Sequence, residues 1–290
     1  MNQTGLHSRF RLLHRQSVPG THVNEDGAGL HGHAAWIIDG ATGVSDRKLT
    51  SGGSDAAWLA GAIDERLTQL ASNGGSEHLD HLEHSVRGAF EAETAHAEMP
   101  GDEHAPSACL GFLRLHGRAG DGLLRLEGHF LGDVVALVPT ESGIVRWTDE
   151  RSKPFERRTL AVLEGASREP GAMPEAVRRQ IQENRTRLNH PEGYWVVNPR
   201  RPWAGRQLRF EAAIAPGQPV VLATDGFMRL VDVFAAYSDA SLHASLSAGE
   251  GERLMQELRW REREDTRAGR YPRVKIHDDA TVLVVAPEHD

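Results

Sequence analysis

The sequence contains a single cysteine, Cys109, in 290 residues. One thiol cannot form an intramolecular disulfide, which indicates a reducing compartment, and we expect the cytoplasm. No uninterrupted apolar run reaches the roughly 18 residues that a membrane-spanning helix needs. The polar N-terminus also lacks the apolar stretch of a signal peptide. We therefore expect no contact with a membrane and a fold stabilised by its own hydrophobic core.

Positive charge is also scarce. Lysine occurs only at Lys48, Lys153 and Lys275, and 33 basic residues against 41 acidic ones give a formal net charge of −8. Proteins that bind nucleic acids present a basic surface, so we do not expect that class here. There is no internal repeat and no low-complexity tract. We expect one domain over residues 1–290.

Short apolar runs bounded by turn residues predict strands. These runs cover 34–39, 107–116, 143–148, 219–224 and 280–286, and residues 123–138 add strand-like apolar stretches with glycine between them. We expect the section from 107 to 148 to form an antiparallel meander. Apolar residues at helical spacing predict helices at 53–70, 81–98, 227–237, 240–246 and 251–267. Helices on both sides of a strand-rich middle favour an α+β fold built in layers.

Residues 150–216 differ from the rest of the chain. They are polar, rich in arginine and interrupted by seven prolines, and they predict an irregular excursion with one helix at about 174–188. The excursion carries Tyr194, Trp195 and Trp203. Aromatic residues on a long loop can serve recognition or can cover part of the core, and the sequence leaves both interpretations open.

Acidic residues lie at the edges of the strongest predicted strands. Asp39 and Asp225 each end an apolar run and precede a glycine, whereas Asp278 and Asp279 precede the last strand. Taken singly, an Asp-Gly pair is typical of a turn. If the strands next to 225 and 278 are antiparallel neighbours, however, their carboxylates lie at one edge of a sheet. The full set comprises Glu25, Asp26, Asp39, Asp133, Asp225, Asp278 and Asp279.

Such a cluster requires a cation. Two like charges 4 Å apart repel by about 4 kcal/mol at an effective dielectric constant near 20. Oxygen ligands without thiolates favour Mg²⁺ or Mn²⁺ over zinc. Cys109 falls in the middle of a predicted strand, and we expect it to lie away from the cluster.

Five motifs in order resemble the metal-dependent protein phosphatases of type 2C, in particular a bacterial branch. They are NED at 24–26, IIDGATG at 37–43, FLGD at 130–133, LATDGFMRLVD at 222–232 and HDDATVLVV at 277–285. Each motif alone is weak, but together they extend over nearly the whole chain. The resemblance implies a four-layer α-β-β-α sandwich with two central antiparallel sheets. It also implies a flap before the second Asp-Gly pair, which corresponds to residues 150–216.

The resemblance implies a site for two Mn²⁺ or Mg²⁺ ions. Asp39 would bridge the two ions, with the carbonyl oxygen of Gly40 as a further ligand. Glu25 would bind the second ion, while Asp225 and Asp278 would complete the shell of the first. Asp39 and Asp225 are therefore the predicted catalytic residues.

Three further residues complete the predicted metal site. Asp26 would orient a metal-bound water, and Asp133 would serve a weaker third ion. Asp279 stands where the family usually has asparagine and would hydrogen-bond a water. The implied mechanism uses a metal-bridging hydroxide that attacks a phosphomonoester in line, without a phosphoenzyme.

Two positions depart from the family pattern. Many members have a phosphate-binding arginine four residues before the position of Glu25, where this sequence has Thr21. Arg11, Arg15 or His22 could replace it, and the sequence does not choose among them. Eukaryotic members have a histidine after the first Asp-Gly pair, where this sequence has alanine at position 41.

The favoured hypothesis is a monomeric serine/threonine protein phosphatase that opposes a kinase in bacterial signalling. A catalytically weak or inactive regulatory module with the same fold is the alternative, motivated by the two departures. A phosphorylated metabolite as substrate also stays open. A phosphatase of the haloacid-dehalogenase type is disfavoured, because those enzymes need a second aspartate two residues after the nucleophile. Here Ala41 and Phe227 occupy those positions.

Overall fold

The computed structural model describes residues 8–41, 48–72, 79–96, 101–118, 122–164 and 173–289. Its strands form two five-stranded antiparallel sheets. The first sheet has the order β1-β10-β9-β6-β7, and the second has the order β2-β3-β4-β5-β8. In the first sheet the strands are β1 (Ser8–Val18), β10 (Ala280–His289), β9 (Val220–Ala223), β6 (Val135–Thr140) and β7 (Gly143–Trp147). In the second they are β2 (Asp26–His31), β3 (Ala34–Ala41), β4 (Ser107–Arg118), β5 (Leu124–Leu131) and β8 (Leu208–Ile214).

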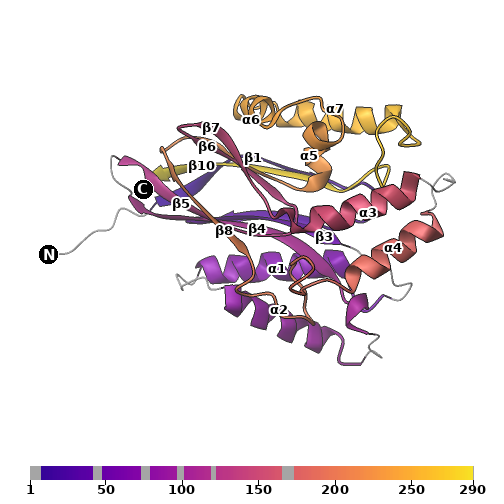
Figure 1. The fold of residues 1–290 in the computed structure, drawn as a ribbon. Coiled ribbons are helices and arrows are strands. Elements are labelled where there is room, and N and C mark those ends of the chain that lie inside the picture. The colour runs from indigo at the N-terminus through magenta and orange to yellow at the C-terminus, as the bar shows by residue number, and fades with distance from the viewer. Residues whose placement is uncertain are drawn as a thin grey trace.

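Helices cover the outer face of each sheet, so the layers run α-β-β-α (Figure 1). Helices α1 (Asp55–Ser72) and α2 (Leu79–Glu93) pack on the second sheet. Helices α5 (Asp225–Asp232), α6 (Asp239–Ser247) and α7 (Gly251–Glu264) pack on the first. Helices α3 (Lys153–Glu164) and α4 (Glu175–Arg185) lie together beside the sandwich. The predicted α+β layer architecture is confirmed.

The strands at the centre of the sandwich are apolar on both faces because both faces are covered. All four residues of β9 are buried, as are the first eight of β10. Side chains of the two sheets meet in a cluster that includes Ile37, Phe130 and Leu283. At the edge, by contrast, β1 leaves Leu12 and Leu13 substantially exposed. None of the described helices is long and apolar enough to cross a membrane.

The predicted meander was only partly correct. Strands β4 and β5 pair in one sheet, and β6 and β7 pair in the other. The chain changes sheets at Gly132, whose φ of +76° is a conformation that glycine adopts without strain. A side chain at this position would also collide with Cys109. The glycine between the apolar runs at 123–138 therefore marks a crossing between layers.

Residues 150–216 are more regular than predicted. The predicted helix is present as α4, but α3 was missed, and so was β8, which forms an edge of the second sheet. Pro154 does not prevent α3 because it stands in the first turn, where its missing N–H has no intrahelical partner. Trp203 is fully buried and Trp195 nearly so, packed with α1 and α2. These tryptophans cover the core.

The remaining predictions hold with shifts of a few residues at the ends. The short helix 227–237 begins earlier and ends at Asp232, and α2 begins at Leu79. Besides β8, two more strands were missed: β1, in the polar N-terminal part, and β2, which begins at Asp26. The last two residues of IIDGATG, positions 42 and 43, and the predicted helix end at 97–98 lie outside the described residues.

Candidate metal centre

Strand register brings the predicted acidic residues to one end of the sandwich. In the second sheet Asp26 pairs directly with Asp39 across β2 and β3. In the first sheet Ala223 of β9 pairs with Val282 of β10, so that Asp225 lies opposite the start of β10, next to Asp278. The antiparallel neighbours that the sequence argument required are therefore present, and the cluster includes carboxylates from both sheets.

Asp133 joins the same cluster from the crossing between the sheets. Val135 of β6 pairs with Ala223 of β9, and Asp133 lies two residues before this pair as Asp225 lies two residues after it. The charge of Asp225 acts on the carboxyl of Asp133. A residue of α3, Glu156, also interacts with Asp133, a contact that the sequence did not suggest.

The glycines of the two Asp-Gly pairs are required by close backbone approach. Gly40 lies within β3, where a Cβ atom would lie 2.5 Å from the carbonyl oxygen of Glu25. Gly226 lies within α5, where a Cβ atom would lie 1.9 Å from the carbonyl oxygen of Asp279. Neither glycine has a positive φ. The turn interpretation of these pairs is therefore wrong, since each glycine lets two site segments touch.

Two residues that sequence analysis missed orient the acidic side chains. Thr224, at the N-cap of α5, donates from its hydroxyl to Oδ2 of Asp26 at 2.9 Å. The hydroxyl of Ser54 donates to Oε1 of Glu25 at 2.5 Å. Neither residue carries a recognisable sequence signal, because serine and threonine are common before helices.

Asp279 connects the last strand to the N-terminal part of the site. Its two carboxylate oxygens accept the backbone amides of Gly20 and Glu25 at 2.7 and 2.8 Å. Charge-assisted bonds of this kind hold a backbone segment firmly. Asp279 therefore fixes the loop that carries Glu25.

Burial and mutual repulsion raise the pKa values of the clustered aspartates. Burial, followed by the charges of Asp26 and Asp225, raises the pKa of Asp39 well above its ordinary value. Burial also raises the pKa of Asp225, as does the charge of Asp278, and Asp225 shares a hydrogen bond with Asp39. The pKa of Asp133 rises in the same way. Removing a carboxylate from water disfavours its charged form, and a like charge nearby adds to the effect.

Asp26 has the most informative shift. Burial is the main cause that raises its pKa from 3.8 to about 8, against the hydrogen bonds from Thr281 and Thr224. The charges of Asp279 and Asp225 raise it further. The carboxyl of Asp26 therefore keeps its proton at neutral pH unless added positive charge compensates its ionised form.

Two basic side chains that sequence analysis missed lie beside these carboxylates. Arg229 of α5 donates to Oδ2 of Asp278 at 2.7 Å and to Oε1 of Glu262 at 2.9 Å. Glu262 belongs to α7, is completely buried and also accepts from Arg259. Lys275 lies 2.8 Å from Oδ1 of Asp278. A buried network therefore connects α5 and α7 to the carboxylate of Asp278.

The chemistry of the donor set fits hard divalent cations. Five aspartates contribute oxygen atoms only, and the two cations at their edge do not balance five carboxylates. As oriented here, however, no three His, Cys, Asp or Glu side chains in the described part of the chain converge as a metal shell. Asp278 is turned toward its cations and Asp26 toward Thr224. The fit therefore rests on the charge excess and the oxygen ligands, which suit Mg²⁺ or Mn²⁺.

The expectation that Cys109 lies away from the cluster was wrong. Cys109 pairs with Asp39 across β3 and β4, and its thiol donates to Oδ1 of Asp133 at 3.2 Å. Burial and then the charges of Asp133 and Asp39 raise the pKa of the thiol. A neutral thiol is a poor metal ligand, so the donor set keeps its oxygen character. A position in the middle of a strand did not reveal which residue would lie opposite.

The candidate phosphate-binding residues differ in where they lie. Arg11 pairs with Glu288 near the far end of β1. Arg15 is directed to the carbonyl oxygen of Ala28 at 3.4 Å. Thr21 and His22 lie exposed in the loop after β1. Neither Arg11 nor Arg15 is therefore directed at the acidic cluster.

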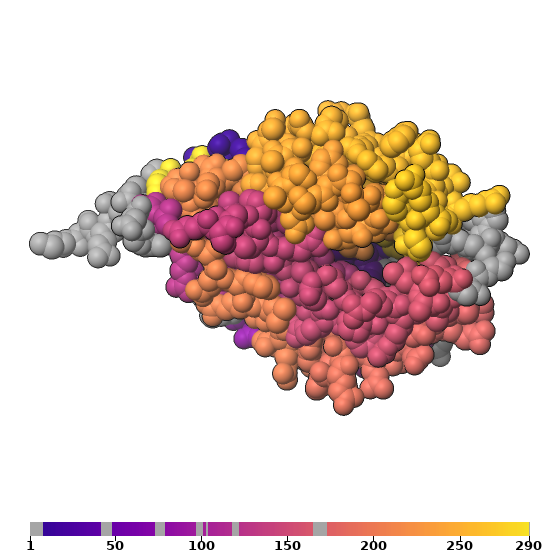
Figure 2. Space-filling view, turned by 45° about the horizontal axis from the view of Figure 1, so that its top comes forward, coloured from indigo at the N-terminus to yellow at the C-terminus, as the bar shows by residue number. Residues whose placement is uncertain are grey.

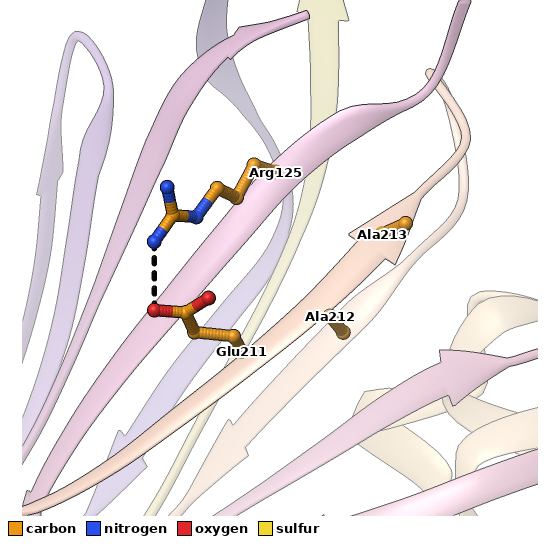
Figure 3. A pocket seen from close by; sticks show the side chains of 4 residues that line it. All are labelled: Arg125, Glu211, Ala212 and Ala213. Carbon is orange, nitrogen blue, oxygen red and sulfur yellow. Dashed lines mark hydrogen bonds and ion pairs between the residues drawn. The ribbon is translucent and has the colours of Figure 1, made fainter. Parts of the chain in front are cut away.

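Figure 2 shows a hollow between the yellow C-terminal segment and the pink segment of α3, with indigo atoms of the N-terminal strands at its base. A depression on β5 and β8 is shown in Figure 3. It is lined by Arg125, Glu211, Ala212 and Ala213, and its two polar side chains pair with each other at 2.7 Å. Because its charges are already neutralised, we assign no chemistry to it.

Comparison with known proteins identifies the fold. No protein-family model and no curated protein matches the sequence. The serine/threonine phosphatase PstP/Ppp of Mycobacterium tuberculosis shares 18% identity at a TM-score of 0.53, covering 98% of this chain and 100% of that one. Its catalytic domain in complex with two manganese ions shares 16% identity at a TM-score of 0.51, over 98% and 99% of the two chains.

A bacterial serine phosphatase shares 16% identity at a TM-score of 0.54, again over 98% of this chain and 99% of that one. All three likenesses extend over both sheets and the helices that cover them. The five sequence motifs resemble the same family, and their acidic residues lie together at one end of the sandwich. The chain therefore has the fold of the metal-dependent serine/threonine protein phosphatases of type 2C.

Proposed function

We propose that the protein is a metal-dependent phosphomonoester hydrolase that acts on phosphoserine and phosphothreonine in proteins. The observation that carries the proposal is that five aspartates from both sheets, Asp26, Asp39, Asp133, Asp225 and Asp278, lie at one end of a sandwich whose fold relatives are phosphatases. The complex of the PstP catalytic domain with two manganese ions supports the choice of cations. The oxygen-only donor set agrees with that choice.

Several residues would hold the cations. Asp39 lies at the centre of the cluster and would contact both ions, with the carbonyl oxygen of Gly40 beside it. Asp225 and Asp278 would complete the first shell, and Glu25 the second. Asp133 would serve a weaker third ion. When bound, such a pair of cations supplies a water of lowered pKa and positive charge for the phosphoryl oxygens.

Other residues would act on the water and on the geometry. The carboxyl of Asp26 is held by Thr224 and would orient the attacking water. Asp279 would act through the backbone, since its oxygens fix the amides of Gly20 and Glu25. Arg229 would hold Asp278 in one orientation from the buried side. Each of these contacts reduces the freedom of a group that must be in place before reaction.

The biological setting belongs to the same proposal. The substrate would be a phosphorylated protein, with a serine/threonine kinase as the opposing enzyme. We propose that residues 1–290 act as one catalytic unit, as a monomer in the cytoplasm. The hollow beside α3 would admit the phosphorylated side chain (Figure 2).

Hydrolysis of p-nitrophenyl phosphate and of phosphopeptides, with EDTA, Mg²⁺ or Mn²⁺, tests the proposal. We expect turnover that depends on the cation and is lost in Asp39→Asn and Asp225→Asn. Asp232→Asn is the matched control, because Asp232 also belongs to α5 but pairs with Arg146 at the surface. Wild-type protein that binds Mn²⁺ but hydrolyses neither substrate would instead indicate a regulatory module.

A further inference from the structure

The proposed phosphatase needs a cation that binds the phosphoryl group of its substrate. The position where the family carries an arginine holds Thr21, and the two nearby arginines are directed elsewhere. The basic residues that act on Asp225 are Arg229 and Lys275. They differ in how firmly they are held, and this difference separates their roles.

Arg229 is fixed in the protein interior. Its side chain is 7% exposed and is bound by both Asp278 and the completely buried Glu262. It also donates to the carbonyl oxygen of Ile276 at 3.4 Å. A guanidinium held by three acceptors in the core cannot turn to meet a substrate. We therefore regard Arg229 as a positioning residue.

Lys275 has the opposite character. Its side chain is 48% exposed, and Asp278 at 2.8 Å is its only ion-pair partner among the described residues. The charges of Asp39 and Asp225 also act on it, so its ammonium lies close enough to the cluster to interact with it electrostatically. Exposed ion pairs contribute little to stability, so this contact is easily exchanged. A flexible lysine with three donors is suited to bind phosphate as a point charge.

We propose that Lys275 binds the phosphoryl oxygens of the substrate, in the role that the family arginine would otherwise fill. The inference rests on the proposed function and adds a substrate-binding residue to it. When a divalent cation neutralises Asp278, the attraction that holds the ammonium of Lys275 beside that carboxylate weakens. Its half-exposed ammonium is then available to an anionic substrate at the edge of the site.

The test separates phosphate binding from metal binding. Calorimetry of wild type, Lys275→Met and Lys275→Arg would measure the Kd for Mn²⁺, and then the Kd for inorganic phosphate in saturating Mn²⁺. Steady-state hydrolysis of p-nitrophenyl phosphate would give kcat and KM. Lys153→Met is the matched control, because Lys153 is also a half-exposed lysine, paired with Glu150 three residues away.

In Lys275→Met we expect the Kd for phosphate and the KM to rise about tenfold or more, because hydrogen bonds to charged groups are among the stronger ones. The Kd for Mn²⁺ should stay the same or fall, since a competing cation has been removed from Asp278. Lys275→Arg should restore part of the phosphate affinity, and Lys153→Met should match wild type.

An unchanged Kd for phosphate in Lys275→Met would overturn the inference, as would weaker Mn²⁺ binding, which would make Lys275 a support for Asp278. A loss of phosphate affinity in His22→Ala, with Lys275→Met unaffected, would assign the role to His22 instead. These results all require a wild-type protein that binds Mn²⁺ and hydrolyses the ester. A wild-type protein that neither binds Mn²⁺ nor hydrolyses the ester would refute the proposed function itself.

Discussion

Replacing Asp26 with asparagine removes the carboxyl whose pKa is raised to about 8 in the folded protein. In an unfolded chain the same carboxyl titrates near 3.8. Between these two values the folded state holds a proton that the unfolded state has released. The free energy of unfolding of the wild type, measured in EDTA, must therefore fall as the pH rises from about 4 to about 8. Asparagine cannot lose a proton, so the variant lacks this contribution.

The magnitude follows from the shift. Each pH unit inside the window costs about 1.4 kcal/mol per group, so three units from pH 5 to pH 8 cost roughly 4 kcal/mol. A chain of this size loses about 2 to 4 °C in Tm for each kcal/mol, which gives roughly 10 °C. The lowered pKa of His129 gives a slope of opposite sign, but it acts equally in both proteins. The raised pKa values of Asp39, Asp133 and Asp225 add slopes of the same sign in both proteins. The difference between wild type and variant therefore reports Asp26 together with the effect of its charge on Asp39.

Thermal unfolding of both proteins at pH 5 and pH 8, with EDTA and with millimolar Mn²⁺, is the assay. We expect the EDTA-treated wild type to lose about 10 °C more than Asp26→Asn between these pH values. Mn²⁺ should remove or reverse the slope in the wild type, because binding favours the charged carboxylates. Equal slopes for the two proteins in EDTA would refute the reasoning, since the pKa of Asp26 would then not be raised in the folded protein.

Three further predictions test the network, the core and the backbone approach. Glu262→Gln should lower the free energy of unfolding by about 3 to 5 kcal/mol in urea titrations, because it removes the buried negative charge that Arg229 and Arg259 share; a loss under about 1 kcal/mol would contradict this. Trp203→Ala should cost about 3 to 5 kcal/mol, whereas the exposed Trp260→Ala should cost less than about 0.5 kcal/mol. Gly226→Ala should abolish Mn²⁺-dependent hydrolysis, since its Cβ would lie 1.9 Å from a carbonyl oxygen; full activity would show that the two segments can separate.

The layer architecture and most of the central strands could be predicted because their apolar runs are continuous. Strands β9 and β10 are buried on both faces, which gives an unambiguous pattern. Strand β1 was missed because it is an edge strand with an exposed face and polar residues. Strand β8 alternates as LRFEAAI, but it follows a long proline-rich stretch that favoured a loop.

The acidic residues of the candidate site could also be predicted, because Asp39, Asp133, Asp225, Asp278 and Asp279 stand beside strong strands and Glu25 and Asp26 belong to the first motif. The residues that contact these acidic side chains could not be predicted. Arg229 reads as a surface residue of a short helix, and only the packing of α5 against α7 shows that it is buried against Glu262. Cys109 was misplaced because a residue in the middle of a strand gives no sign of its cross-strand neighbour. Pairings between distant segments come from the fold and not from local sequence.

The candidate centre takes Asp26 and Asp39 from one sheet and Asp225 and Asp278 from the end of the other. An ion bound between them would hold the two sheets together at this end of the sandwich. The spacing of its ligands would depend on the thickness of the apolar layer in which Ile37, Phe130 and Leu283 meet. Side chains that never approach the ion would thereby help to set its affinity, and separating the two sheets would require releasing it.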